Sequence, residues 1–426
     1  QPLQLDGEYT DIRLIAFGKN GDEVYFLAST NGEPEGVFKL NIETKKVLKV
    51  FQDNEVAPKQ VWVDEFSKAL FAIEIEPGYP TYVFPDKNSA MAQRLKAMLD
   101  AIPGNQIHIV SSTLNGELSV IYASSDINPG SYYLFKAKEN QLQFLFSAKK
   151  WLKPEQMAET KPIKFTSRDG LTIHGYLTLP NNIEPEDLPL VVMPHGGPHG
   201  PRDWWGFDSE VQFLANRGIA VLRVNFRGSG GYGSTFEHAG HRKWGSEIQY
   251  DIIDGVKYVI EEGYVNAENM CIMGASFGGY SALQSAIIEP DMFKCAIGVV
   301  GVYDLPLMFE EGDIPERDIG QRYLTKVLGT DKDQLIAFSP SYNIDKLKAP
   351  VLIVHGGEDD RAPIEQAESL IKALEQANHP YVYELLEDEG HGFYKPEHRE
   401  KYYRQVLSFL DEHLNLSTRS IKGAPP

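Results

Sequence analysis

Short apolar runs of strand length, separated by Asn, Gly, Asp and Pro, fill the chain up to Trp151. This pattern predicts β structure broken by tight turns. Paired runs recur at 21–50, 67–86 and 116–146, with starts about 45–50 residues apart, which is typical of four-stranded propeller blades. We therefore predict an incomplete β-propeller of about three blades over residues 1–150, with an irregular β-sandwich as the alternative. The middle repeat also contains SAMAQRLKAML (89–99), which predicts a helix.

Strands and helices alternate from Trp151 onward. A hairpin is expected at 164–180, turning at 168–170. Apolar strands are then expected at 188–197, 219–228, 270–274, 295–304, 349–359 and 381–386, and helices at 209–218, 246–263, 278–289, 364–378 and 398–414. Strands rich in Val, Ile and Leu that alternate with helices indicate a mostly parallel sheet with helices on both faces. Residues 151–426 are therefore predicted to form a separate α/β domain.

Charge and composition exclude several classes of function. The 426 residues carry 60 acidic and 41 basic side chains, a net charge of −19, which repels the phosphate backbone of nucleic acids. No apolar run reaches the roughly 18 residues that a membrane-spanning helix needs. Cys271 and Cys295 lie in apolar runs and are interpreted as packed thiols, because two cysteines form neither a disulfide framework nor a zinc site.

The chain begins with Gln1-Pro2, without methionine or a signal sequence. We expect it to be part of a longer protein. This leaves its localisation, cytoplasmic or periplasmic and secreted, unassigned.

The stretch GASFG (274–278) places a serine in a glycine-rich turn between an expected strand and an expected helix. A serine hydroxyl is a weak nucleophile that must protrude toward substrate and needs a base beside it. A sharp strand-to-helix turn meets the first need and requires small neighbours, hence G-x-S-x-G. The sequence predicts that Ser276 is a catalytic nucleophile. The alternative is a serine that only caps the helix.

The acid and the base of such a triad follow the serine along the chain. Asp359 and Asp360 end the strand at 349–359, and we favour Asp359 because it comes directly off the strand. Asp360 is expected to pair with Arg361 or to cap the next helix. His391 lies between two glycines after the last strand, and we predict that it is the base. The later histidines interpreted as surface residues are His379, His398 and His413.

An acyl-transfer site also needs N–H donors for the oxyanion. One should be the N–H of Phe277, which follows the nucleophile, and the other should come from the loop HGGP (195–198). We favour Gly197 over Gly196 in that loop. The alternative is an ordinary glycine turn.

Two other patterns point to cofactors only superficially. Residues 228–233 match G-x-G-x-x-G, but neither an amphipathic helix nor an acid-ended strand follows, as a dinucleotide site requires. His238 and His241 have the spacing of metal ligands but lack a third partner. We therefore expect no cofactor and no metal.

These motifs together resemble the prolyl oligopeptidase family of serine peptidases, especially its acylaminoacyl-peptidase-like branch, over residues 151–415. The segments that carry the resemblance are HGGP (195–198), NFRGSGGYG (225–233), GASFGGY (274–280), HGGEDDRAP (355–363) and EGHGF (389–393). The resemblance implies an α/β-hydrolase domain with a β-propeller, and hydrolysis of short peptides through an acyl-enzyme. It assigns Ser276 as nucleophile, Asp359 as acid, His391 as base, and the N–H groups of Gly197 and Phe277 as oxyanion donors.

The sequence departs from the family pattern in three ways. Phe277 stands where tyrosine is frequent, most propeller blades are absent, and the paired glutamates of dipeptidyl members cannot be placed. The resemblance also implies a pocket near 302–311, lined by Leu305, Met308 and Phe309, although an apolar run there is equally compatible with core.

The expected partner is a peptide substrate, together with either a second copy of the chain or a missing N-terminal part of the propeller. A carboxylesterase on the same fold and a catalytically silent scaffold are the alternative functions.

Overall fold

The computed structural model describes residues 8–181, 183, 186–414 and 416. The chain folds as two compact units. The first comprises Gln1–Pro162 with Trp204–Gln212 and Gly230–Glu237, and the second comprises the remaining residues. The predicted domain boundary after residue 150 stays a prediction.

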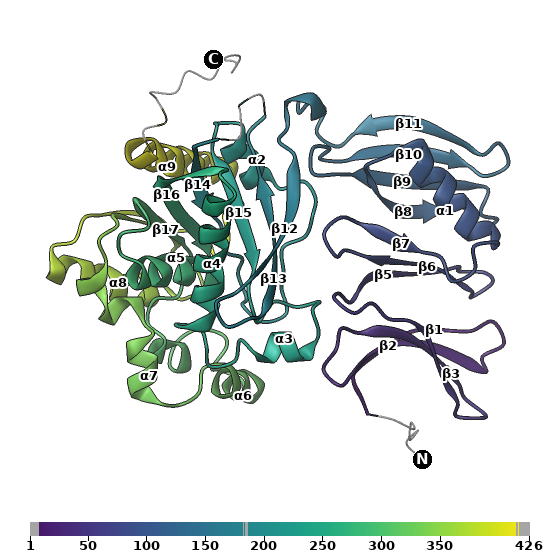
Figure 1. The fold of residues 1–426 in the computed structure, drawn as a ribbon, viewed down its shortest axis with the longest axis horizontal. Helices are drawn as coiled ribbons and strands as arrows, with labels where there is room; N and C mark the ends of the chain where they lie inside the picture. The colour runs from purple at the N-terminus through teal and green to yellow at the C-terminus, as the bar shows by residue number, and fades with distance from the viewer. Residues whose placement is uncertain (1–7, 182, 184–185, 415, 417–426) are drawn as a thin grey trace. The chain divides into compact units, whose positions relative to one another are not determined.

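The first unit is built from three antiparallel sheets, each a simple meander, and these correspond to the predicted blades (Figure 1). Their strands are β1 (Tyr9–Phe17), β2 (Glu23–Thr30), β3 (Gly36–Asn41) and β4 (Val47–Phe51); β5 (Pro58–Val63), β6 (Leu70–Ile75) and β7 (Thr81–Val83); and β8 (Gln106–Ser112), β9 (Leu118–Ser124), β10 (Ser131–Lys136) and β11 (Gln141–Ser147). A short 3₁₀ helix, η1 (Pro154–Gln156), follows β11.

The predicted helix of the middle repeat is α1 (Ala90–Ala101). Ser89 caps it, with its side chain accepting a hydrogen bond from Ala92 N, and so satisfies one of the free N–H groups of the first turn. One face of α1 is buried through Ala92, Leu95 and Met98, spaced at helical intervals. That face joins a core formed with residues of the second and third sheets, namely Trp62, Phe71, Ala72, Ile107, Ile121 and Phe135.

The second unit is organised around an eight-stranded sheet in the order β12-β13-β15-β14-β16-β17-β18-β19. These strands are β12 (Thr160–Thr166), β13 (Thr172–Thr178), β14 (Leu188–Val192), β15 (Ala220–Asn225), β16 (Val265–Ala275), β17 (Cys295–Val299), β18 (Val351–Gly356) and β19 (Tyr381–Leu386). The strands from β15 to β19 in this order pair in parallel, and β13 is antiparallel to β15. Gly170 lies in the turn of the predicted hairpin with φ +90°.

Every residue of β14, β15, β17 and β18 is buried, so both faces of the central sheet are covered, as expected for parallel strands. The helices of the second unit are α4 (Glu247–Glu261), α5 (Phe277–Ile288), α6 (Asp318–Val327), α7 (Lys332–Ala337), α8 (Ile364–Ala377) and α9 (Pro396–Leu414), with 3₁₀ turns η2 (Pro306–Phe309), η3 (Pro340–Tyr342) and η4 (Ile344–Lys346). Two further helices, α2 (Ser209–Ala215) and α3 (Ser234–His238), begin in segments that belong to the first unit. Among the described residues, no helix combines the length and the apolar character that a membrane span requires.

The two cysteines form a disulfide bond, so the prediction of packed free thiols is wrong. Cys271 on β16 and Cys295 on β17 are register partners with Cα atoms 4.8 Å apart. Neighbouring parallel strands bring their side chains to the same face of the sheet at this point. The sequence separation of 24 residues contains no sign that these two strands are adjacent.

Candidate active site

Ser276 occupies the sharp turn between β16 and α5 with φ 58° and ψ −122°, a backbone conformation that residues other than glycine rarely adopt. The flanking glycines permit this turn. A Cβ atom on Gly274 would lie 2.4 Å from the carbonyl carbon of Gly278, and one on Gly278 would lie 2.2 Å from Pro194 O. Larger residues at either position would collide with backbone, which explains both glycines of the G-x-S-x-G pattern.

Ser276 does not act as a side-chain cap of α5. It stands at the N-cap position, but among the described residues its side chain makes no capping hydrogen bond. Its backbone N–H donates to Val299 O at 2.9 Å. Ser276 is a partly exposed residue and Ala275 beside it is exposed, so this turn reaches the solvent. This argues against the capping alternative and leaves the hydroxyl available for chemistry.

Asp359 and His391 are hydrogen-bonded to each other. His391 Nδ1 lies 3.0 Å from Asp359 Oδ1 and 2.8 Å from Oδ2. A carboxylate can only accept, so Nδ1 carries the proton and the neutral ring presents Nε2 as an acceptor. Asp359 is 4% exposed, and its Oδ1 also accepts from Arg361 N and Ala362 N, both at 2.9 Å. The acid is thereby fixed in orientation, and it fixes the tautomer of His391.

The loops that carry this pair dock against each other through glycine. A Cβ atom on Gly356 would lie 2.3 Å from Gly390 O, and one on Gly357 would lie 2.3 Å from Glu387 O. Glu358 N donates to Glu389 O at 2.9 Å across the same contact. The Gly-Gly pair after β18 therefore lets the loop of His391 approach Asp359 closely.

Ser276 and His391 make no hydrogen bond with each other in the part of the chain that the structure describes. Catalytic hydrogen bonds are often long in a free enzyme and shorten only when substrate binds. Ser276 follows β16, Asp359 follows β18 and His391 follows β19. Because these strands are parallel, all three residues lie at the carboxyl edge of one sheet, where such sheets bind ligands.

Asp360 does not have the predicted roles. Arg361 pairs with Asp313 at 2.7 Å, and α8 has Pro363 rather than Asp360 at its N-cap. Asp360 is exposed, whereas Asp359 is buried at the end of β18. The geometry thus favours Asp359 as the partner of His391.

The two predicted oxyanion donors lie on backbone close to Ser276. Phe277 is the first residue of α5, so no carbonyl of the helix can accept from its N–H. Its ring is buried against aromatic neighbours, Phe226, Trp244 and Tyr280. A Cβ atom on Gly196 would lie 3.5 Å from Ser276 Cβ, which places the glycine loop beside the serine. Gly197 has φ +125°, a conformation that favours glycine.

The residues predicted for the substrate pocket lie mostly inside the protein. Leu305 is fully buried and Met308 is 8% exposed, whereas Phe309 is partly exposed. Leu305 N also donates to Ser339 Oγ at 2.8 Å. Their role in substrate binding stays a prediction.

The likeness to known proteins covers both units. The family model described as the prolyl oligopeptidase family matches residues 205–417, a segment that contains all three candidate triad residues. The chain belongs to the prolyl oligopeptidase family. It is 30% identical over 414 residues to dipeptidyl aminopeptidase BIII of Pseudoxanthomonas mexicana, covering 92% of this chain and 58% of that relative.

Two further known proteins extend this comparison. The acylamino-acid-releasing enzyme of Rattus norvegicus is 29% identical over 254 residues, which cover 57% of this chain and 34% of that enzyme. A puromycin-hydrolyzing peptidase of Mycobacterium tuberculosis has the same fold, with a TM-score of 0.77, 21% identity, and coverage of 94% of this chain and 62% of that one. The predicted fold class, an α/β-hydrolase domain preceded by an incomplete propeller, is confirmed. The chain spans little more than half the length of dipeptidyl aminopeptidase BIII.

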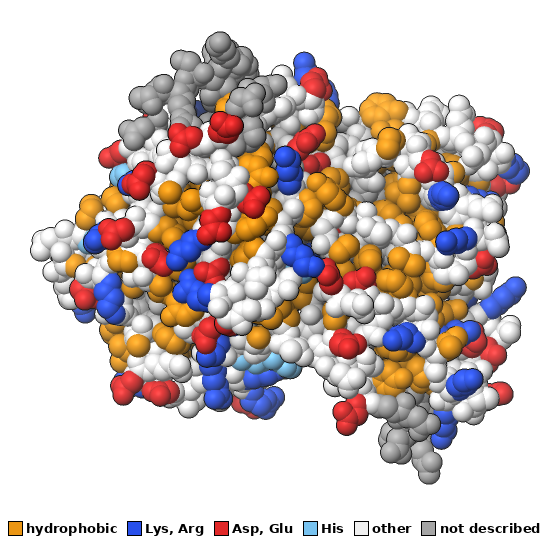
Figure 2. Space-filling view, viewed as in Figure 1, with side chains coloured by type: hydrophobic (Ala, Val, Ile, Leu, Met, Phe, Trp, Pro, Cys, Tyr) orange, Lys and Arg blue, Asp and Glu red, His pale blue; other side chains and the backbone are white. Residues whose placement is uncertain are grey.

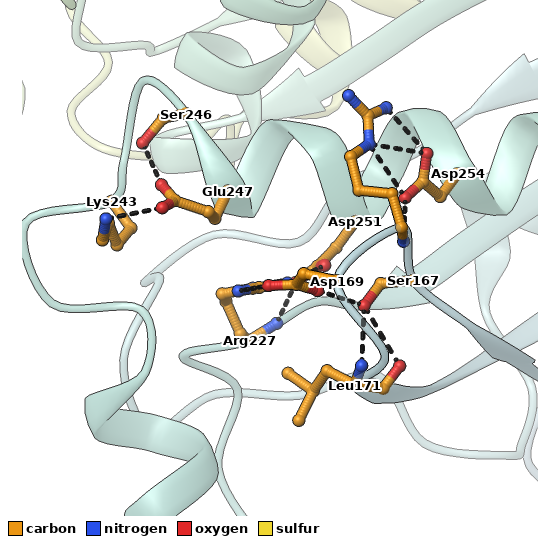
Figure 3. Close-up of polar contacts among 10 residues, drawn as sticks. Ser167, Asp169, Leu171, Arg227, Lys243, Ser246, Glu247, Asp251 and Asp254 are labelled. Carbon is orange, nitrogen blue, oxygen red and sulfur yellow. Dashed lines mark hydrogen bonds and ion pairs between the residues drawn. The ribbon is translucent and has the colours of Figure 1, made fainter.

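Sequence reasoning identified the family motif NFRGSGGYG but not what its arginine does. Arg227 is 6% exposed and donates to Asp251 and Asp169 at 2.7–2.9 Å, and Figure 3 shows its guanidinium between these two carboxylates. Hydrogen bonds from Arg227 and Ser167 hold the pKa of Asp169 far below its usual range, so that carboxyl is ionised. The ion pairs anchor the end of β15, from which Ser229 extends.

The histidines interpreted as surface residues are also more constrained than expected. His398 Nδ1 lies 3.0 Å from the buried Glu389, which also accepts from Tyr394 N and Lys395 N. These hydrogen bonds to Glu389 stabilise the loop that carries His391. The sequence signal for this role was the position of Glu389 two residues before His391 in EGHGF. A carboxylate that is buried there needs several hydrogen-bond donors, and those donors fix the loop around it.

Among the described residues, no group of three or more His, Cys, Asp or Glu side chains has an arrangement that suits a metal ion. His238 and His241 lie close together, with ring centroids 4.7 Å apart.

Proposed function

We propose that this chain is a serine peptidase that hydrolyses short peptides through an acyl-enzyme formed on Ser276. The observation that carries the proposal is the buried Asp359 carboxylate bonded to His391 Nδ1, on the same sheet edge as the strained turn of Ser276. Membership of the prolyl oligopeptidase family supports it.

In the proposed mechanism, His391 Nε2 takes the proton of Ser276 Oγ as the oxygen attacks the substrate carbonyl. The resulting oxyanion accepts hydrogen bonds from the N–H groups of Gly197 and Phe277. His391 then donates its proton to the leaving amine, and a water activated by the same ring hydrolyses the acyl-enzyme. Asp359 keeps the ring in the required tautomer and stabilises its cationic form.

Labelling with a fluorophosphonate probe tests the nucleophile. We expect covalent modification of Ser276, identified by peptide mass spectrometry, and no modification of Ser276→Ala. Folded protein that resists the probe would favour the silent scaffold instead.

A substrate panel then separates the peptidase from an esterase. We expect turnover of a p-nitroanilide peptide as well as a p-nitrophenyl ester, whereas an esterase would cleave only the ester. Comparing each peptide with a free and with an acetylated amino terminus would separate dipeptidyl from acylaminoacyl specificity. The same panel, applied to Met308→Ala, tests the pocket: unequal changes among substrates would support it, and equal changes would indicate a folding role.

A further inference from the structure

The loop that carries His391 also presents a large aromatic side chain to the solvent. Tyr394, three residues after His391, is 81% exposed. Within the part of the chain that the structure describes, its hydroxyl forms no hydrogen bond and its ring stacks on no other aromatic ring. A tyrosine combines an apolar ring with a polar tip, and such side chains are frequent where proteins contact ligands. The ring of Tyr394 is therefore available for a contact outside the chain.

The backbone of Tyr394 is held in place although its side chain is exposed. Tyr394 N donates to both carboxylate oxygens of the buried Glu389 at 3.1 Å, and Lys395 N donates to the same carboxylate at 2.9 Å. The preceding Phe393 packs on Tyr402 of α9, with ring centroids 5.3 Å apart. Because only the two side-chain torsions of Tyr394 remain to be ordered, a contact with this ring costs little conformational entropy.

The ring of Tyr394 folds back over the residue that follows the candidate base. A Cβ atom on Gly392 would lie 3.3 Å from the Tyr394 hydroxyl oxygen and 3.4 Å from its ring atom Cε2. Gly392 follows His391 directly, and it forms a β-bridge with Gly390 on the other side of the histidine. The side chain of His391 is itself partly exposed. The phenol ring and the imidazole therefore lie on one short loop and can both be reached from solvent.

The role of His391 indicates which part of a substrate comes close to this loop. In the proposed mechanism the imidazole donates its proton to the leaving amine. A general acid must lie within hydrogen-bond reach of the group that it protonates, so the leaving nitrogen lies against His391 Nε2. The side chain of the leaving residue branches from the carbon next to that nitrogen. The residue that follows the scissile bond is therefore the part of the peptide closest to the surface around His391.

We propose that Tyr394 binds the residue that follows the scissile bond and makes the enzyme favour an aromatic side chain at that position. This inference rests on the proposed function. A contact between two aromatic rings changes a rate ratio by about threefold to tenfold beyond the effect of burial alone. Tyr394 is thus assigned a role in specificity, on the side of the site from which the amine product departs.

The test uses the acyl-enzyme, because its reaction with an amine involves only the leaving-group side of the site. A p-nitrophenyl ester acylates Ser276 and releases p-nitrophenol, and the acyl group then passes to water or to an added amino-acid amide. In the second case the amine nitrogen bonds to the acyl carbon, the bond from that carbon to Ser276 Oγ breaks, and His391 transfers the amine proton to Oγ. This step is the reverse of acylation by a peptide, so the amine occupies the place of the leaving residue.

The measured quantity is the ratio of amide product to acid product, with phenylalaninamide and with glycinamide. We expect the wild-type chain to favour phenylalaninamide by about threefold to tenfold. Tyr394→Ala should lose most of this preference, and Tyr394→Phe, which keeps the ring, should retain it. Both amides react with the same acyl-enzyme and the same base. A change in the reactivity of His391 therefore cancels when the two amides are compared.

Tyr381→Ala is the matched control. Tyr381 is the first residue of β19, whereas His391 lies beyond the last residue of that strand, and the Tyr381 hydroxyl donates to Glu375 at 3.0 Å. We expect this variant to show the wild-type preference. Thermal unfolding shows whether each variant is folded. If Tyr394→Ala is not folded, Tyr394→Gln replaces it, because glutamine also lacks the ring but keeps a side chain of several atoms.

Two results would overturn the inference: an unchanged preference in the folded variant without the ring, or a wild-type chain that does not distinguish the two amides. In both cases the acyl-enzyme still forms, so the proposed nucleophile is unaffected. The proposed function fails separately, if the wild-type chain neither reacts with the fluorophosphonate nor releases p-nitrophenol from the ester. The assignment of Tyr394 would then fail with it.

Discussion

Ser276, Asp359 and His391 are expected to act as one proton-transfer unit. Ser276→Ala and His391→Ala should therefore each lower kcat by roughly 10⁴–10⁶-fold, and the double variant should lose little more. Asp359→Asn should also lose several orders of magnitude, because an amide can donate to His391 Nδ1 and thereby stabilise the wrong tautomer. Steady-state kinetics on a p-nitroanilide peptide measure these effects.

His413→Ala is the control for these variants. This residue lies in the last turn of α9 with its ring against Phe409, so kcat should not change. Near wild-type turnover by folded His391→Ala would show that another group is the base.

Glu74 of the first unit is a buried carboxyl with an incomplete set of partners. It shares the Gln106 amide with Glu76, at 3.2 and 3.0 Å, and among the described residues its Oε2 accepts no hydrogen bond. Burial raises the pKa of Glu74 to about 7, against the attraction of Lys59 and with added repulsion from Glu76. An ordinary glutamate ionises near about 4.3, so between these values the unfolded chain releases a proton that the folded chain keeps. The free energy of unfolding should therefore fall as pH rises through this window.

Glu74→Gln removes this titration. The variant should unfold at a higher temperature than wild type at pH 8, and the difference should shrink at pH 5, where Glu74 is already protonated in the folded chain. Glu76→Gln is the matched control, at the residue that follows the last residue of β6. It loses its ion pair with Lys59, 2.6 Å away, and should destabilise at both pH values. An identical pH dependence in Glu74→Gln and wild type would contradict the assignment.

At the scale of elements, the disulfide links β16, which carries Ser276, to its neighbour β17. It closes a segment of 24 residues, for which the chain-entropy model gives about 3 kcal/mol of stabilisation. Reductant should therefore lower the unfolding temperature, and the variant with both Cys271→Ala and Cys295→Ala should not respond to it. Thiol titration in denaturant without reductant should find no free thiol; two free thiols would show that the bond is absent.

Helices α6 and α7 were not predicted from the hydrophobic pattern of the sequence. They lie in the long connection between β17 and β18, for which only an apolar segment at 302–311 was noted. The sequence did predict the elements next to the candidate site, and the predicted bounds of β19 are those found in the structure. These elements could be recognised because strand-length apolar runs ending in glycine are local signals. Short helices such as α7, with six residues, depend more on tertiary packing than on their own sequence.

For the molecule as a whole, the first and third sheets end in edge strands that expose large apolar side chains. Leu14 and Phe17 on β1 are 74% and 59% exposed, and Phe144 and Phe146 on β11 are 54% and 56% exposed. Figure 2 shows apolar side chains reaching the surface, interspersed with both signs of charge. Unpaired edges with apolar side chains favour association with another chain.

We therefore expect the isolated chain to self-associate, with a mass above 47.8 kDa by light scattering. The variant with both Leu14→Lys and Phe146→Lys should shift the mass toward the monomer. Ile319→Lys should not, because Ile319, which is 70% exposed, lies on α6 and not on a sheet edge. A wild-type chain that is monomeric at all concentrations would refute this expectation.

The sequence by itself determined the class of each segment and the candidates for the chemistry. Alternating apolar runs specify strands, helical spacing specifies buried faces, and the glycines around Ser276 and His391 mark turns that few other residues allow. These signals are local, since each arises from neighbours along the chain.

The tertiary structure alone decided which distant residues meet. It paired Cys271 with Cys295, directed Arg361 to Asp313 rather than Asp360, and placed Arg227 between Asp169 and Asp251. It also brought Ser229 to His195, 34 residues away. Such contacts depend on which strands become neighbours, and that order results from packing the whole sheet with its helices, which no short stretch of sequence encodes.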